Sequence, residues 1–145
     1  MKYNFFVPGI PVAKGSAKAF YNKKAGKIVV MQDNRSRQKP WASMISYTAQ
    51  ESGVQIVDGP VVLSLTFNMP RPKSHYGSGK NSAVLKLGSP TYHTSVPDLD
   101  KLVRCVMDAL TGIAWHDDKQ VASIRTAKRY YGDGPGVQIE IEGRK

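Results

Sequence analysis

The sequence has one cysteine, Cys105, so no disulfide can form within the chain, which favours a reducing compartment. No apolar run approaches the ~20 residues of a membrane-spanning helix. Pro8 and Pro11 interrupt the N-terminal stretch where the apolar part of a signal peptide would lie. Internal repeats and low-complexity tracts are also absent. We therefore expect a soluble cytoplasmic protein that contacts no membrane, and not a disulfide scaffold or a repeat protein.

Acidic residues are scarce, and they are unevenly placed. The chain has 11 Asp and Glu against 21 Lys and Arg, for a net charge of +10. Five of the acids fall within residues 98–118, so the rest of the chain is more basic still. Such a surface attracts polyanions, of which nucleic acid is the commonest, although positive charge also serves solubility alone. The composition predicts a nucleic-acid partner and leaves the acidic window to be explained.

The 145 residues fit one domain with a sizeable core. The apolar residues of the segment 61–69 alternate, which is typical of a strand, whereas those of 99–110 recur at helical spacing up to a stop at Thr111-Gly112. These patterns predict a single α+β domain over residues 1–145, with a small mixed sheet packed with two main helices. The expected strands cover 2–7, 18–21, 27–31, 61–69, 121–131 and 136–142, and the expected helices 34–53 and 99–110.

Several residues are expected in the core. Trp115 and Cys105 fall in apolar surroundings, and the first helix presents one apolar face. We expect this face to comprise Trp41, Met44, Ile45, Thr48 and Ala49.

The acidic window, "VPDLDKLVRCVMDALTGIAWHDDKQV", opens on two aspartates that are two positions apart. On one helix they would face opposite sides, because two residues turn the helix by ~200°. They can serve one site only if Asp98 lies in the turn before the helix, which Pro97 favours. We further expect the chain to return so that Asp118 approaches Asp98.

Close carboxylates repel one another unless a cation compensates their charge. Mg²⁺ prefers such oxygen ligands and supports phosphodiester hydrolysis. Each aspartate also has a simpler interpretation: Asp98 as a helix cap, Asp100 with Arg104 as a surface ion pair, and Asp117 with Asp118 as a solvated turn. Residues alone leave the metal site and these alternatives open.

The same window resembles the signature of the RusA family of Holliday junction resolvases, which are common in phages and prophages. The shared pattern is "DLD", a basic residue, a helix containing "DAL", and a Trp-containing segment that ends in "DDKQV". The opening "VPGIPVAKGSAK" and the later "RPKSH" are also similar to family segments. The resemblance implies a Mg²⁺-dependent endodeoxyribonuclease, with Mn²⁺ as a substitute, that acts as a homodimer and resolves four-way DNA junctions by paired nicks in recombination and repair.

The resemblance also implies roles for individual residues. The metal-binding carboxylates of the family fall on Asp98, Asp100 and Asp118, with Asp117 adjacent and a further candidate. The catalytic lysine of the family falls on Arg104, and the usual asparagine after the second aspartate is Lys101. Arginine keeps the charge but donates a proton less readily, so the role of the family lysine remains open between Arg104 and Lys101. Asp108 is interpreted as structural.

The remaining expectations concern DNA and assembly. The basic loop 71–97 is expected to flank the junction and to become ordered only when DNA arrives. Two alternatives to a resolvase stay open: a less selective metal-dependent nuclease for branched or flap DNA, and a non-catalytic DNA-binding protein. The candidate DNA contacts are Lys14, Lys18, Arg71, Lys73, Lys80, Arg125, Lys128 and Arg129.

Overall fold

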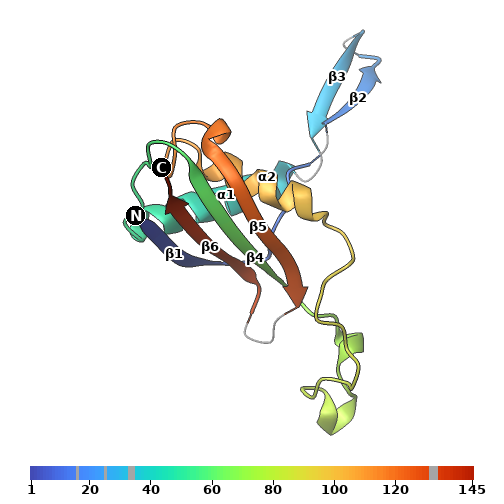
Figure 1. The fold of residues 1–145 in the computed structure, drawn as a ribbon. Helices are drawn as coiled ribbons and strands as arrows, with labels where there is room; N and C mark the ends of the chain where they lie inside the picture. Colours follow the sequence, from blue (N-terminus) through green and yellow to red (C-terminus); the bar gives the residue numbers. More distant parts are fainter. Residues whose placement is uncertain (16, 25, 33–34, 131–133) are drawn as a thin grey trace.

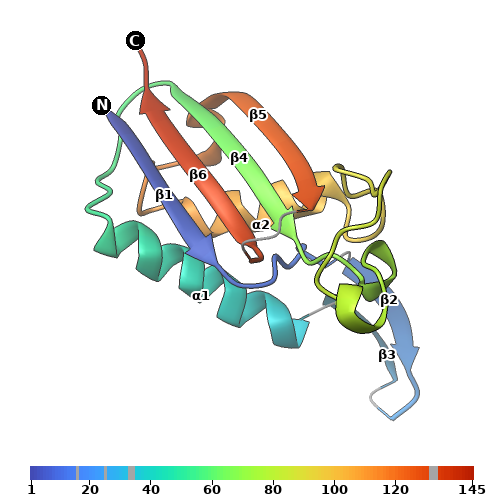
Figure 2. The same ribbon diagram turned by 90° about the horizontal axis from the view of Figure 1, so that it is seen from below.

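A computed structural model describes residues 1–15, 17–24, 26–32, 35–130 and 134–145, with the backbone alone for 17–22, 29–32 and 35–36. A four-stranded mixed sheet has the order β1-β6-β4-β5, and β2 and β3 form a separate antiparallel hairpin that projects from the body (Figures 1 and 2). The α+β class predicted from the sequence is confirmed. The elements are β1 (Lys2–Pro8), β2 (Ala17–Asn22), β3 (Lys27–Gln32), α1 (Arg35–Glu51), β4 (Val61–Met69), α2 (Leu99–Leu110), β5 (Val121–Tyr130) and β6 (Gly136–Gly143), with short 3₁₀ turns η1 (Lys73–His75), η2 (Gly79–Asn81) and η3 (Asp118–Gln120).

One face of the sheet forms the core. The odd-numbered residues of β4 are buried, and β6 and β1 present Ile139 and Phe5 in register on the same side. Both helices cover this face, and the opposite face stays open (Figure 2). Alternation along β4 therefore predicted the buried face correctly, because successive strand residues point to opposite sides of a sheet.

The segment β4-α2-β5 is a β-α-β unit. β5 pairs with β4 in parallel, and parallel neighbours need a crossover connection, which α2 supplies. The helix therefore runs antiparallel to both strands (Figure 2), and its first turn lies at their carboxyl ends. In open α/β sheets, ligands bind at this end of the strands. The topology thus presents the "PDLD" junction where a site is expected.

Helix α1 buries Trp41, Ile45 and Ala49 as predicted. Met44 is wrongly placed in the predicted apolar face, since it is 42% exposed. Helical geometry explains the difference, because residue 44 is ~100° from residue 45 and so lies at the margin of the buried stripe. The predicted core positions Trp115 and Cys105 are confirmed, and burial raises the pKa of the Cys105 thiol to about 11.

The loop 71–97 is attached to the end of β5. The guanidinium of Arg71 donates to the carbonyl of Pro90 at 2.7 Å and lies 4.9 Å from the ring centre of Tyr130. The backbone N–H of Tyr130 in turn donates to the carbonyl of Thr91 at 2.8 Å. Both ends of the loop are therefore held without DNA, and the ordering of the rest of the loop by DNA stays a prediction.

Within the part of the chain that the structure describes, no helix is both long enough and apolar enough to cross a membrane.

Candidate active site

The first turn of α2 presents two carboxylates. Asp98 precedes the helix in an extended conformation (φ −70°, ψ 141°), as the sequence predicted, but its side chain makes no capping hydrogen bond. That side chain is 59% exposed and lies 3.6 Å from the ammonium of Lys101. Asp100 is exposed in the first turn and has no ion-pair or hydrogen-bond partner among the described residues. Both carboxylates therefore remain available to a ligand.

A polar stripe continues along the exposed side of α2. Arg104 is exposed one turn after Asp100, and the described residues offer it no ion-pair or hydrogen-bond partner. Two turns after Asp100, Asp108 forms an ion pair with Lys14 at 2.5 Å. The structural interpretation of Asp108 is thus supported, and Arg104 lies beside the first turn without a charged partner in the described part of the chain.

Strand β5 brings Lys128 to this first turn. Its ammonium donates to the carbonyls of Ser95 at 2.6 Å and of Pro97 at 2.7 Å. Burial lowers the pKa of Lys128, and the nearby charge of Asp98 partly offsets that effect. The pKa of the neighbouring His93 is also lowered, first by burial and then by the charge of Lys128. A residue predicted as a DNA contact therefore supports the turn before α2.

Asp118 lies at the other end of α2. Its Oδ1 accepts hydrogen bonds from the hydroxyl of Thr111 at 2.5 Å and from Nε1 of Trp115 at 3.1 Å. Thr111 is the residue that ends the helix, so Asp98 and Asp118 are separated by the length of α2, ~20 Å at 1.5 Å per residue. The expectation that one chain brings Asp118 toward Asp98 is therefore wrong, because the returning strand carries Lys128 to that end.

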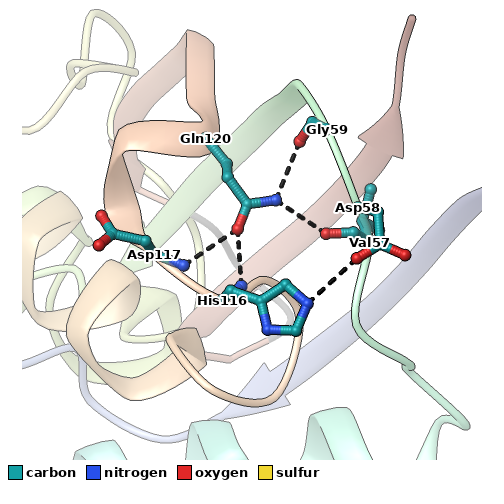
Figure 3. A network of polar contacts seen from close by, with 6 residues as sticks. All are labelled: Val57, Asp58, Gly59, His116, Asp117 and Gln120. Carbon is teal, nitrogen blue, oxygen red and sulfur yellow. Dashed lines mark hydrogen bonds and ion pairs between the residues drawn. The ribbon is translucent and has the colours of Figure 1, made fainter.

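A network of polar contacts holds the turn that carries Asp118 (Figure 3). The side chain of Gln120 accepts from the backbone N–H groups of His116 at 2.7 Å and Asp117 at 3.0 Å, and donates to the carbonyls of Val57 at 2.8 Å and Gly59 at 3.0 Å. These four bonds tie the turn to the segment that leads into β4. They fix the backbone position from which Asp118 projects.

Asp117 makes different contacts from Asp118. Its carboxylate accepts from the backbone N–H of Lys119 at 2.9 Å, and together with Gln120 it forms a capping box around η3. Its side chain points away from the network (Figure 3). Sequence reasoning missed Gln120, although Asp117-x-x-Gln120 has the spacing of a capping box. It also missed Asp58, whose carboxylate lies 3.1 Å from Nε2 of His116; no sequence pattern linked this pair.

The predicted DNA contacts are divided among several places. Strand register puts Arg125 and Arg129 on the open face of the sheet, opposite the helices, and confirms that they share a face. Lys73 and Lys80 are exposed in the loop. Arg71, Lys14 and Lys128 already make the internal contacts given above, and the side chain of Lys18 lies outside the described residues.

The donor set can be compared with what a metal needs. Among the residues that the structure describes, no three His, Cys, Asp or Glu side chains lie close enough to hold a metal ion. One chain thus offers the two carboxylates of the first α2 turn. Mg²⁺ keeps several waters and is often bound by only one or two carboxylates, so this pair fits a magnesium ion that takes further ligands from elsewhere.

Comparison with known proteins gives two results. A protein-family model described as "Endodeoxyribonuclease RusA" matches residues 8–142, nearly the whole chain. The chain is also 30% identical over 138 residues to the "Uncharacterized protein YqaN" of Bacillus subtilis (strain 168), covering 94% of this chain and 93% of that protein. Together with the exposed "PDLD" carboxylates, these matches show that the chain belongs to the RusA family of endodeoxyribonucleases, which resolve Holliday junctions.

Proposed function

We propose that this protein resolves four-way DNA junctions in recombination and repair by paired, Mg²⁺-dependent nicks. Family membership gives the reaction class, and the observation that carries the site is the first turn of α2. There Asp98 is not used as a cap and Asp100 has no partner among the described residues. Both lie at the carboxyl ends of the parallel β4–β5 pair, where α/β sheets bind ligands.

Asp98 and Asp100 would hold the Mg²⁺. When bound, the ion lowers the pKa of an attacking water and neutralises charge on the phosphate. Arg104, exposed and unpaired among the described residues, would contact the scissile phosphate. Lys101 instead faces Asp98 at 3.6 Å and partly compensates its charge. This geometry favours Arg104 as the cation that stabilises the transition state.

We propose a homodimer with a composite site. The family resemblance assigns Asp118 to the metal, yet one chain keeps Asp118 ~20 Å from Asp98. A two-fold axis near the middle of α2 would set the helices of two subunits antiparallel. Asp118 of the partner subunit would then lie beside Asp98, and the reverse would hold at the second site. Two such sites match the two nicks that a two-fold symmetric junction requires.

The less selective nuclease remains an alternative within this family chemistry, and paired nicks distinguish the two. The non-catalytic DNA-binding alternative is set aside, because the family is an endodeoxyribonuclease family.

The first test uses a labelled four-way junction. With Mg²⁺ or Mn²⁺ we expect paired, symmetry-related nicks that yield nicked duplexes, and with EDTA we expect binding without cleavage. A matched flap and a linear duplex serve as controls. Equal cleavage of all three substrates would favour the less selective nuclease, and full junction cleavage in EDTA would contradict the metal site.

A second test separates the two basic residues of the helix. Arg104→Ala should lower the cleavage rate at saturating enzyme by ~10²-fold, which is typical when a group that stabilises transition-state charge is removed. Lys101→Ala should have a smaller effect, since its charge acts on Asp98 and not on the substrate. Single-turnover rates measure both. Equal, small effects would show that neither residue acts at the scissile phosphate.

A further inference from the structure

The side chain of Lys128 extends from the edge strand β5 to the turn that precedes α2. Register with Phe67 of β4 places it on the helix-covered face. Its ammonium contacts two carbonyls of one turn, those of Ser95 and Pro97, at 2.6 and 2.7 Å. Distances this short are typical of charge-assisted hydrogen bonds, which are stronger than neutral ones. Lys128 thus connects the sheet to the turn that leads into Asp98.

The carbonyl of Pro97 belongs to the peptide unit that Pro97 shares with Asp98. The six atoms of a peptide unit lie near one plane, so holding the oxygen of Pro97 also orients the N and Cα atoms of Asp98. On the other side, the carbonyl of Asp98 accepts from the N–H of Leu102 at 3.1 Å, the first bond of the helix. The backbone of Asp98 is therefore held from both sides, while its side chain makes no capping bond.

We propose that Lys128 is a positioning residue for Asp98, which it holds in the orientation that binds the metal. This inference rests on the proposed function of Asp98. A direct contact of Lys128 with DNA phosphate is less favoured, because two of its three ammonium protons are already donated to carbonyls. By contrast, Arg125 on the same strand is exposed and has no partner among the described residues.

Mn²⁺ binding to the free protein tests the role apart from catalysis. We compare the parent, Asp98→Asn, Lys128→Met and Lys128→Arg by electron paramagnetic resonance of Mn²⁺, after circular dichroism has shown that each is folded. Loss of a residue that orients a metal ligand typically costs ~10- to 100-fold in metal affinity, and we expect this from Lys128→Met. Lys128→Arg keeps the charge and the donors and should recover most of the affinity. If Lys128→Met does not fold, Lys128→Gln replaces it.

The control is Lys2→Met on β1, the opposite edge strand. Lys2 also forms a close pair, with Glu140 at 2.5 Å, but two strands lie between its strand and β5. Lys2→Met should leave the Mn²⁺ affinity unchanged. If the loss of any paired lysine weakened Mn²⁺ binding, this variant would show a lower affinity too.

Three results would overturn the inference, and they are distinguishable. A folded Lys128→Met with parental Mn²⁺ affinity overturns the role of Lys128 alone. Parental Mn²⁺ affinity with weakened junction binding in EDTA would instead make Lys128 a DNA contact. A parent that binds no Mn²⁺, or binds it equally well as Asp98→Asn, overturns the proposed metal site and this inference with it.

Discussion

Asp98→Asn should abolish junction cleavage and leave junction binding intact. The change keeps the size of the side chain but removes the charge that would hold the proposed metal. Metal ions contribute several kcal/mol to the stabilisation of a phosphoryl transition state, and ~1.4 kcal/mol equals a factor of ten, so we expect a loss of ~10³-fold or more. Junction binding depends on the basic surface of the protein. It should be unchanged or tighter, because the variant has one negative charge fewer to repel the DNA phosphates.

Nicking and gel-shift assays on one preparation measure both properties. Asp100→Asn should behave in the same way, because it supplies the second carboxylate of that turn. Asp108→Asn is the matched control, since it removes an exposed carboxylate from the same helix. Its partner is Lys14, and surface ion pairs contribute little, so cleavage should persist. Cleavage retained by both Asp98→Asn and Asp100→Asn would overturn the metal assignment.

Much of the fold followed from the sequence. Alternation along β4 and helical spacing along α2 predict both elements because each pattern reports burial on one side. The position of Asp98 before the helix also followed, from Pro97 and the two-residue spacing to Asp100. Each of these predictions depends only on residues that are close together in the sequence.

The position of Asp118 did not follow, because it depends on the path of the chain. The strand must span the length of the helix, ~20 Å, before it reaches the first turn of α2, so the residues that begin β5 stay at the far end of the helix. The residue that reaches Asp98 is Lys128, ten positions later, and only the strand register reveals it. The attachment of Arg71 to Tyr130 likewise joins residues far apart in sequence, which is why the sequence did not predict it.

The proposed composite site makes a second prediction with a large effect: two inactive variants should restore one another. Asp98→Asn keeps Asp118, and Asp118→Asn keeps Asp98. In a mixed dimer, one site combines both intact residues and the other site combines both changes. Co-expressed chains with different tags, purified through both tags, should therefore cut one strand per bound junction, although each homodimer is inactive.

A mixed dimer of Asp98→Asn and Asp100→Asn is the matched control. Both residues belong to the same first turn, so neither site is intact and no cleavage is expected. Light scattering must report a particle of about twice the chain mass of 16.0 kDa for every mixture, which shows that subunits have paired.

Strand cleavage by the purified Asp98→Asn and Asp118→Asn mixed dimer tests the account most directly. We predict single nicks in a four-way junction with Mg²⁺, at close to half the strand-cutting rate of the parent, and none from the Asp98→Asn and Asp100→Asn control. A mixed dimer as inactive as its two homodimers would contradict the composite site.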